Sequence, residues 1–383
     1  MDKIVVLDFG SQYSHLICRR IREFSVYAEL VPFDISYEEL QKLNPKGIIF
    51  SGGPSSVYNS DAPVPENKIF EMGLPLLGIC YGHQLIVNKF GGKVKRANKE
   101  YGSSLLTIDS DKDLLSDVGE SVRAWMSHGD EAEEIPPGFQ IIGHTEGAKA
   151  AAIASEERSV YGIQFHPEVV HTEQGTEILK NFVLKVCKAK QDWSMEGFID
   201  TAVEKISKIE GNVLCGVSGG IDSTVVALLI HKAIGDRLKC VFVNNGLLRL
   251  NEENEVEDMF KNNFNVNFTS VDASEKFLGK LKGIEDPEKK RMIIGEEFVH
   301  VFTEFAEKSG PFKWLAQGTL YPDVIESGVS KGPAAVIKSH HNVGGLPDWL
   351  NLEILEPVRE LYKDEVREIA KILQVPEKLF MRH

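Results

Sequence analysis

One short string in the chain, Ser218-Gly219-Gly220-Ile221-Asp222-Ser223, combines two glycines with an acidic residue and two hydroxyls. The apolar residues before it predict a short buried strand, and the residues over 222–234 predict a helix. Glycines let backbone N–H groups approach a phosphate, and a helix N-terminus adds a partial positive charge. Since Asp222 suits Mg²⁺ and Ser223 a phosphate oxygen, the string predicts a phosphate-binding loop. The alternative is an ordinary strand-turn-helix corner with a capping aspartate.

The cation that a phosphate loop needs is missing from this string. A Walker loop carries a lysine directly after its glycines, and none stands here, so a compensating cation must come from elsewhere. The glycine-punctuated stretch over 326–346 contains the basic cluster Ile337-Lys338-Ser339-His340-His341-Asn342. We expect this stretch to act as a lid that brings Lys338 onto a triphosphate. The alternative is a solvated loop with an isolated charge.

A second string, Gly78-Ile79-Cys80-Tyr81-Gly82, has the form of a strand-to-helix turn that exposes a nucleophile between two glycines. Cys80 would lie at a helix N-terminus, where the dipole favours a thiolate. The string that ends in His166-Pro167-Glu168 offers a base and a residue to orient it. We expect His166 to exchange a proton with Cys80 and Glu168 to hold the imidazole. The remaining cysteines are expected to be buried packing residues.

Further polar groups are expected around Cys80. The bare-backbone turn Ser51-Gly52-Gly53-Pro54 follows a predicted strand and could supply an N–H opposite that of Tyr81, so that the two form an oxyanion hole. Gln84, on the predicted helix after Cys80, is a candidate contact to the substrate.

Alternating short apolar strands and helices must position these residues, which predicts an α/β fold with two doubly wound domains. Ligand sites gather at the carboxyl ends of such parallel strands. The predicted strands cover residues 4–7, 48–50, 76–79, 105–108, 123–126, 151–154, 161–165, 213–217, 265–271 and 314–316, with a further strand beginning at 239. The predicted helices include residues 12–24, 178–186, 198–206, 222–234 and 287–308.

Composition narrows the class of protein. The 383 residues are 42% hydrophobic, enough for two cores. The formal net charge of −14 argues against a nucleic-acid partner. Five cysteines without a C-x-x-C spacing argue against a zinc site or a disulfide framework. With no signal peptide and no apolar run near 18 residues, we expect a cytoplasmic protein without a membrane partner.

The strings resemble two known families. Ser218–Ser223 is similar to the loop of the ATP pyrophosphatases, which cleave ATP between its α and β phosphates and adenylylate an oxygen. Cys80, His166 and Glu168, together with the turn at 51–54, resemble the class I glutamine amidotransferases. That resemblance implies a flavodoxin-like amidotransferase domain over 1–189, in which glutamine is hydrolysed through a thioester on Cys80, and a Rossmann-like ATP pyrophosphatase domain over 190–383. It also implies that His128 and Asp130, in Met126-Ser127-His128-Gly129-Asp130, lie beside the glutamine pocket; the alternative there is a turn with a capping aspartate.

An amidotransferase followed by this pyrophosphatase resembles the family of glutamine-hydrolysing GMP synthases, from residue 3 to the last. The resemblance implies that ATP, with Mg²⁺ held at Asp222, adenylylates xanthosine monophosphate (XMP), and that ammonia from glutamine then displaces AMP to give GMP. It further implies that Arg291 helps to hold the XMP phosphate; the alternative is an exposed helical charge in a run of basic residues.

Two departures from the family pattern leave alternatives open. Asn244 stands where the family usually has an aspartate, which could weaken metal or ribose binding. The chain stops at Met381-Arg382-His383, so we expect the family's C-terminal dimerisation domain to be absent, and the family's homodimer is not assumed. Alternatives are an amidating synthetase for another acceptor, and a nucleotide-binding or partner-dependent form with only glutaminase or partial adenylylation activity.

Overall fold

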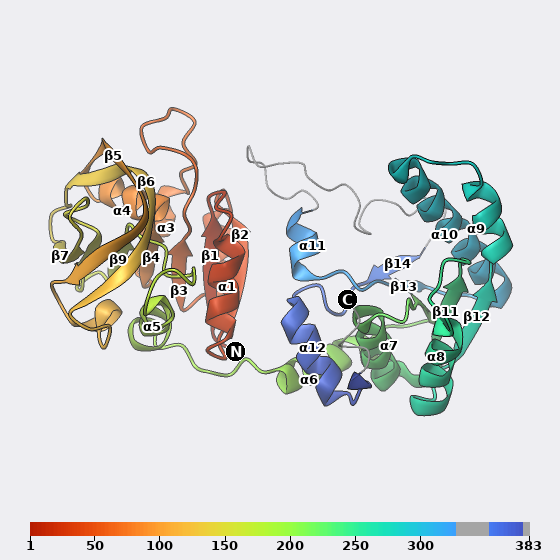
Figure 1. Cartoon of the computed structure of the whole chain (residues 1–383). Coiled ribbons are helices and arrows are strands. Elements are labelled where there is room, and N and C mark those ends of the chain that lie inside the picture. Colours follow the sequence, from red (N-terminus) through yellow and green to blue (C-terminus); the bar gives the residue numbers. More distant parts are fainter. Residues whose placement is uncertain (327–351, 378–383) are drawn as a thin grey trace. The chain divides into compact units, whose positions relative to one another are not determined.

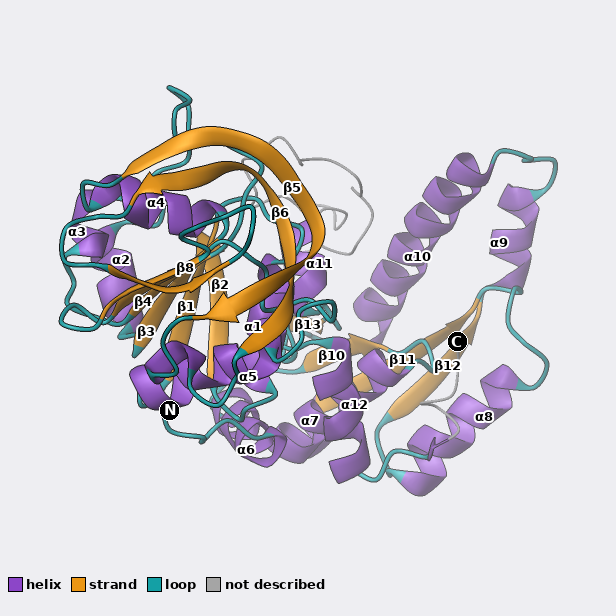
Figure 2. Ribbon diagram, turned by 60° about the vertical axis from the view of Figure 1, so that its left-hand side comes forward, coloured by secondary structure: helices purple, strands orange, loops and turns teal. Residues whose placement is uncertain are grey.

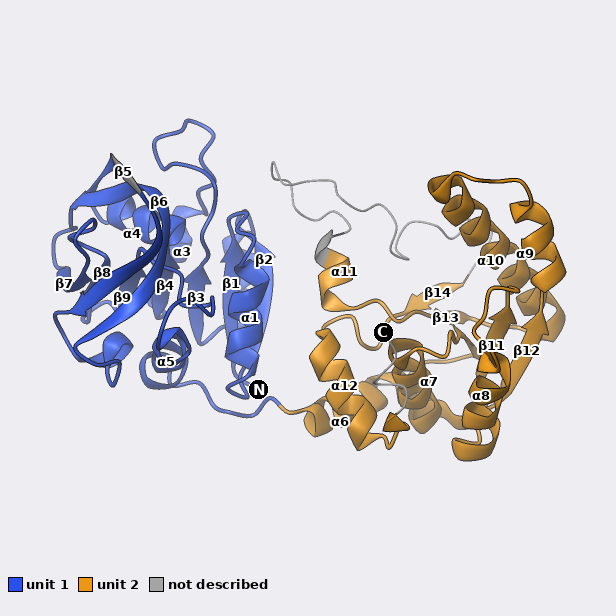
Figure 3. Ribbon diagram, viewed as in Figure 1, with its two compact units in different colours: residues 1–193, 330–335 blue, residues 194–329, 336–383 orange. Residues whose placement is uncertain are grey.

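The chain folds into two compact units, which Figure 3 colours separately. The computed structural model describes residues 1–326 and 352–377. The first unit comprises Met1–Trp193, and the second begins at Ser194. The polar segment before this point packs on the first unit, where the Trp193 ring lies 4.8 Å from that of Tyr27. No helix in the described ranges is long and apolar enough to span a bilayer.

The first unit, described throughout residues 1–193, is built on a nine-stranded mixed sheet (Figure 1). In their order across the sheet the strands are β2 (Tyr27–Pro32), β1 (Lys3–Asp8), β3 (Gly47–Phe50), β4 (Leu76–Ile79), β9 (Val160–Ile163), β8 (Ala152–Ser155), β7 (Gln140–His144), β5 (Lys93–Ile108) and β6 (Ser121–Glu134). The strands from β2 to β9 in this order are parallel. Their neighbours from β8 to β6 pair antiparallel.

The helices of the first unit follow the strands in alternation, as the sequence predicted. They are α1 (Ser14–Arg22), α2 (Tyr37–Leu43), α3 (Asn67–Phe70), α4 (Tyr81–Lys89) and α5 (Gly175–Lys180), which continues as a π-helical segment, Asn181–Val186. Strands β3, β4, β8 and β9 are buried along their whole length, as expected where a sheet is covered on both faces. The mixed α/β fold class is therefore confirmed for this unit.

The β5–β6 pair is longer than predicted. The expected strands over 105–108 and 123–126 are only the ends of a long antiparallel hairpin, which Figure 2 shows curving beside the parallel strands. The prediction of short strands was wrong because the middle of the hairpin is polar. Along β6, buried and more exposed residues alternate over most of the strand, so that only one face packs inward. A register shift between Arg96 and Glu100 bends the pair.

The described part of the second unit contains a five-stranded, all-parallel sheet. In order across it, the strands are β12 (Phe268–Asp272), β11 (Leu238–Asn244), β10 (Val213–Gly216), β13 (Trp314–Ala316) and β14 (Glu353–Leu355). The helices are α6 (Met195–Ser207), α7 (Ile221–Ile234), α8 (Glu252–Asp258), α9 (Ser274–Leu281), α10 (Pro287–Ser309), α11 (Tyr321–Glu326) and α12 (Lys363–Ile372). The predicted Rossmann-like alternation is confirmed, and β14 and α12 add to it.

Candidate functional site

The turn between β4 and α4 presents Cys80 in a strained conformation. The backbone of Cys80 has φ +53° and ψ −104°, a left-handed region that non-glycine residues rarely adopt. A Cβ on Gly78 would lie 2.3 Å from the Gly82 carbonyl oxygen, and one on Gly82 would lie 2.5 Å from that of Phe50. Only glycine fits at either position, so the predicted glycine-nucleophile-glycine turn has a steric cause.

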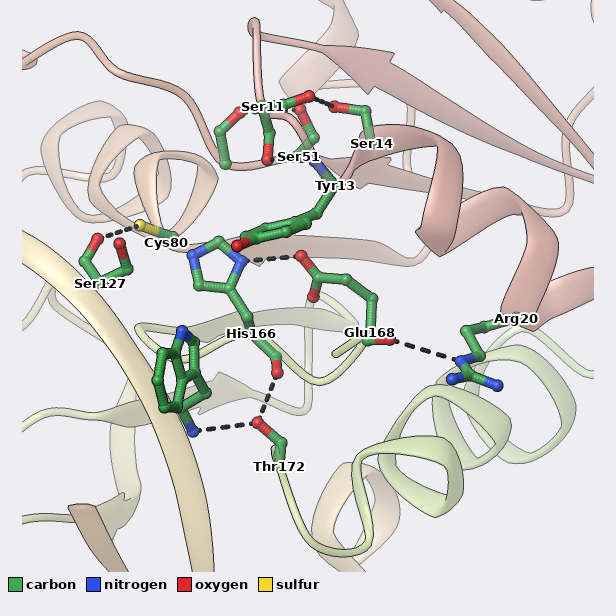
Figure 4. A network of polar contacts seen from close by, with 12 residues as sticks. Ser11, Tyr13, Ser14, Arg20, Ser51, Cys80, Ser127, His166, Glu168 and Thr172 are labelled. Carbon is green, nitrogen blue, oxygen red and sulfur yellow. Dashed lines mark hydrogen bonds and ion pairs between the residues drawn. The ribbon is translucent and has the colours of Figure 1, made fainter. Parts of the chain in front are cut away.

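His166 and Glu168, which follow β9, lie beside Cys80 (Figure 4). The His166 Nδ1 is 2.7 Å from Glu168 Oε1, and both side chains are buried, with 6% and 0% of their surface exposed. Cys80 lies on the other side of the ring, and its Sγ donates to the Ser127 carbonyl oxygen at 3.6 Å. Gly52 closes the group, since a Cβ there would be 3.1 Å from His166 Cε1 and 3.6 Å from Cys80 Cβ. The structure thus brings together a sulfur, an imidazole and a carboxylate.

The charges of this group favour a protonated imidazole. Burial works against the charged ring, but the Glu168 carboxylate and the Cys80 sulfur outweigh it and raise the pKa of His166 to about 11. At neutral pH the ring therefore carries a positive charge next to the sulfur, which stabilises an anion on Cys80. The arrangement can serve as a nucleophile with its proton donor already in place.

Two residues that the sequence did not mark contact His166, one at its backbone and one at its ring. Thr172 Oγ1 donates to the His166 carbonyl oxygen at 2.5 Å and accepts from the Trp125 backbone N–H at 3.0 Å. The Tyr13 ring meets the imidazole edge-on, with centroids 5.5 Å apart. Figure 4 shows Tyr13 against the ring and Thr172 below it. Tyr13 comes from a distant segment, whereas Thr172 lies only six residues after His166 and was not singled out because nothing in the sequence predicted the turn between them.

A cavity of about 420 Å³ opens at Cys80, within the usual size range of small-molecule sites. Its wall comes from the turn after β3, the start of α4 and both strands of the β5–β6 hairpin. It is lined by Gly53, Pro54, Ser55, Ser56, Cys80, Tyr81, Gln84, Tyr101, Ser127, His128, Gly129 and Asp130. The cavity therefore collects most of the residues predicted for substrate binding in this unit.

The side chains of Gln84 and His128 form part of the cavity wall and are held there by hydrogen bonds. Gln84 Nε2 donates to the Asp130 carbonyl oxygen at 3.0 Å, which fastens α4 to β6. The His128 ring is held from both sides: Nδ1 lies 3.1 Å from the Asp130 carbonyl oxygen, and Nε2 lies 3.2 Å from Glu100 Oε2. Glu100, which the sequence did not mark, follows the register shift in β5. These contacts fix the shape of the cavity.

The turn after β3, over residues 51–54, brings its backbone close to Cys80. At Gly53 a Cβ would lie 2.5 Å from the Phe9 carbonyl oxygen, so this residue must be glycine for the turn to pack on the end of β1. Ser51 Oγ accepts from the Phe9 N–H at 3.0 Å and ties the same two strands. Of the residues predicted for the oxyanion hole, Gly53 and Tyr81 line the cavity at Cys80, and Gly52 lies against His166 and Cys80.

In the second unit, Ser218–Ser223 forms the turn between β10 and α7, as predicted. Gly219 has φ +73°, and Gly220 caps the helix in an extended conformation. The Ser223 hydroxyl accepts from the Ser218 N–H at 3.2 Å and donates to the Gly220 carbonyl oxygen, which folds the loop back on the helix start. The first backbone N–H groups of an α-helix have no partner within the helix, so this loop is suited to an anion.

Asp222 in this loop has an unexpected partner. Lys363 Nζ, at the start of α12, lies 2.6 and 2.5 Å from the two carboxylate oxygens of Asp222. A cation is therefore present at the loop, although it comes from 141 positions further along the chain. Gly318, after β13, closes the other side, since a Cβ there would be 3.6 Å from that of Asp222. Sequence reasoning did not identify Lys363, because the α12 helix was not predicted.

The remaining predicted residues lie apart from the loop or outside the described residues. Lys338 lies outside the described residues, as does the rest of its predicted lid after Glu326. Arg291 lies on α10 with 71% of its side chain exposed, and its Nη1 donates to Glu288 at 2.9 Å on the same helix. The structure does not bring Arg291 to the loop by any contact among the described residues.

The contacts of Asn244, at the end of β11, explain why an asparagine and not an aspartate stands at this position. Its Nδ2 donates to Glu253 Oε2 at 2.7 Å, and its Oδ1 accepts from the Gly246 N–H at 2.9 Å. Ser270 donates to the other oxygen of Glu253. An aspartate at 244 would lose the donor and face a carboxylate, so Glu253 supplies the negative charge at this strand end.

The loop offers a metal ion one carboxylate, so its other ligands would have to come from a bound nucleotide and from water. Across residues 1–326 and 352–377, no cluster of three or more histidine, cysteine, aspartate or glutamate side chains is placed to hold a metal ion. Mg²⁺ in nucleotide sites commonly has one or two carboxylates, with phosphates and waters as its other ligands. Asp222 fits that single-carboxylate role.

Comparison with known proteins agrees with this geometry. The family model for class I glutamine amidotransferases matches residues 5–186, and the model for NAD synthase matches residues 193–292. The chain is 52% identical over 385 residues to a glutamine-hydrolysing GMP synthase of Brachyspira hyodysenteriae, covering all of this chain and 75% of the relative. It is 54% identical over 383 residues to that of Caldicellulosiruptor saccharolyticus, covering 99% of this chain and 75% of the relative. With such identity over nearly its whole length, the chain belongs to the family of glutamine-hydrolysing GMP synthases.

Proposed function

We propose that this chain converts XMP to GMP, using glutamine as the nitrogen donor and cleaving ATP to AMP and pyrophosphate. The observation that carries the proposal is that one chain holds the buried Cys80–His166–Glu168 group at a cavity and a glycine-rich loop bearing Asp222. The relatives' shared name, glutamine-hydrolysing GMP synthase, supports XMP as the acceptor. The proposal places the reaction in the cytoplasm, without a nucleic-acid or membrane partner.

In the first unit, the Cys80 sulfur attacks the side-chain carbonyl carbon of glutamine. The negative charge that develops on the carbonyl oxygen is stabilised by the backbone N–H groups of Tyr81 and Gly53. The C–N bond breaks as His166 gives its proton to the departing nitrogen, and ammonia leaves a glutamyl thioester. Water then adds to the thioester as His166 takes a proton, the C–S bond breaks, and glutamate is released.

Substrate position in the cavity depends on its fixed wall. His128 and Asp130 lie on the β6 side of the cavity, and Gln84 holds that side to α4. The Asp130 carboxylate is a candidate partner for the α-amino group of glutamine, because opposite charges pair at short range. Gln84 acts in this proposal chiefly through the Asp130 backbone.

In the second unit, the loop binds the phosphates of ATP through its backbone N–H groups and the Ser218 and Ser223 hydroxyls. The 2-oxygen of XMP attacks the α-phosphorus, the bond to the bridging oxygen breaks, and pyrophosphate leaves. Ammonia then adds to the adenylylated carbon, and AMP departs with the oxygen. Asp222 would hold Mg²⁺, which when bound neutralises charge on the phosphates. Arg291 remains a candidate contact to the XMP phosphate.

The test compares two nitrogen donors. Cys80→Ala should abolish GMP formation from glutamine, ATP and XMP, and it should preserve GMP formation when ammonium replaces glutamine. Cys187→Ala, which removes another buried thiol of the same unit, is the matched control and should keep both activities. If the parent chain forms no GMP with excess ammonium, ATP and XMP, the proposal is wrong. Pyrophosphate release with a carboxylic acid in place of XMP would instead identify a different acceptor.

A further inference from the structure

The ion pair between Asp222 and Lys363 joins the starts of two helices. Asp222 is in the first turn of α7 and Lys363 is the first residue of α12, which packs against α7. The lysine Nζ lies 2.6 and 2.5 Å from the two oxygens and occupies both of them. The side chains keep 42% and 31% of their surface exposed, for the lysine and the aspartate respectively. The pair therefore lies at the edge of the phosphate loop, within reach of a ligand.

The position of Lys363 is unfavourable for its own helix. A cation at a helix N-terminus opposes the helix dipole, whereas the acidic residues that follow it in α12, Asp364 and Glu365, favour it. Partly exposed ion pairs also add little to folding stability. Neither the stability of the helix nor that of the ion pair explains why a lysine should start α12, which leaves a ligand as the explanation.

The electrostatics of the phosphate loop explain why a lysine stands at the start of α12. The loop is suited to phosphates, yet Asp222 places a negative charge where they would bind, and like charges repel at this range. A cation is needed to offset the carboxylate in the free protein and the phosphates in the complex. Lys363 is close enough for both, because a lysine side chain is flexible and its ammonium can turn between neighbouring acceptors.

We propose that Lys363 is an exchangeable counterion of the phosphate loop. In the free protein it occupies both oxygens of Asp222; with a metal-bound triphosphate, Asp222 turns to the metal and Lys363 turns to the phosphate oxygens. The inference rests on the proposed function of the loop. It has a specific consequence: a divalent cation alone must compete with Lys363 for Asp222, so metal and nucleotide enter the site together.

The experiment measures binding rather than turnover. Titration calorimetry on the full chain would use three probes: Mn²⁺ alone, inorganic pyrophosphate with Mg²⁺, and ATP with Mg²⁺. Lys363→Met should weaken binding of the two phosphate probes by roughly 10- to 150-fold, the loss typical of one hydrogen bond between charged groups. The same variant should bind Mn²⁺ alone more tightly than the parent, because Asp222 is no longer occupied.

Matched variants separate charge from folding. Lys371→Met removes an exposed lysine from the last turn of the same helix and should leave all three affinities unchanged. Lys363→Arg keeps the cation and should retain most of the phosphate affinity. Should Lys363→Met fail to fold, as judged by circular dichroism, Lys363→Gln provides the same comparison. In the Asp222→Asn background, Lys363→Met should no longer increase Mn²⁺ affinity, because the carboxylate is gone.

The outcomes distinguish the two proposals. If the parent chain binds neither phosphate probe, the proposed function of the loop fails, and this inference fails with it. If the parent binds both and Lys363→Met binds them equally well, only the role of Lys363 is overturned. If Lys363→Met loses phosphate affinity without gaining Mn²⁺ affinity, the exchange is refuted, and Lys363 is a fixed phosphate contact.

Discussion

Replacing Glu168 with glutamine tests whether this carboxylate keeps the His166 ring charged. Glutamine has the same shape, and its amide oxygen can still accept from His166 Nδ1, which in the parent lies 2.7 Å from Glu168 Oε1. The change therefore removes the negative charge while the ring keeps an acceptor. Burial would then oppose the imidazolium with only the Cys80 sulfur to favour it.

The size of the effect follows from the geometry. With charge centres about 4 Å apart and an effective dielectric constant near 20, the attraction between Glu168 and the imidazolium is about 4 kcal/mol. That energy lowers the pKa of His166 by roughly 3. Because the pKa of His166 is about 11 in the parent, the ring stays charged well into the alkaline range there, whereas in the variant it should lose its proton above about pH 8.

Two measurements check this expectation. The alkaline limb of the glutaminase profile should move to lower pH by roughly 3 in Glu168→Gln, and the glutaminase rate at about pH 10 should fall by about 10², because there the His166 ring is still charged in the parent and neutral in the variant. Amination with ammonium should be unchanged, and so should all activities of Glu177→Gln, which alters a partly exposed carboxylate on α5 that pairs with Lys180. An alkaline limb at the same pH as in the parent, with a glutaminase rate at about pH 10 within twofold of the parent, would refute the reasoning.

Thermal unfolding separates charge from stability in this variant. Glu168 Oε2 is buried and has no hydrogen-bond partner among the described residues. An amide nitrogen in its place would leave buried donors unsatisfied, at a cost of about 1–3 kcal/mol. A lower melting temperature with an unshifted alkaline limb would show that Glu168 supports the fold and does not set the charge of His166.

Three further changes have definite outcomes. Asp222→Asn should remove pyrophosphate release and leave thioester formation at Cys80 largely intact; equal loss of both, measured with separate glutaminase and pyrophosphate assays, would contradict separate sites. Asn244→Asp should destabilise the second unit by about 1 kcal/mol in urea unfolding, because it sets two carboxylates against each other, and Glu253→Gln should reverse the loss. Burial lowers the pKa of His83 to about 3 from 6.5, so the unfolded chain binds a proton in that range that the folded chain does not. Stability should therefore fall by about 1.4 kcal/mol per pH unit on acidification from 6.5 towards 3, and unfolding free energies of His83→Leu should lack that part of the slope.

Local sequence signals predicted the parts of this protein whose cause is local. The two glycines that the Cys80 turn needs stand within five residues, and the central parallel strands β3, β4 and β9 are short apolar runs buried along their whole length. The polar middle of the β5–β6 hairpin gave no such signal, because only one of its faces is buried. Lys363 is placed by tertiary packing at 141 positions from Asp222, so spacing along the chain could not indicate it.

The two units use the same device, an ion pair at the carboxyl ends of parallel strands, with opposite degrees of burial. His166 and Glu168 are 6% and 0% exposed, so separating them would leave a buried charge uncompensated. The pair therefore stays fixed while the other ring nitrogen of His166 gives and takes a proton. Asp222 and Lys363 are 31% and 42% exposed, and water compensates either charge when they part. A fixed pair suits proton transfer, which needs constant geometry. An exposed pair suits a site that must release its own counterion each time a polyphosphate arrives.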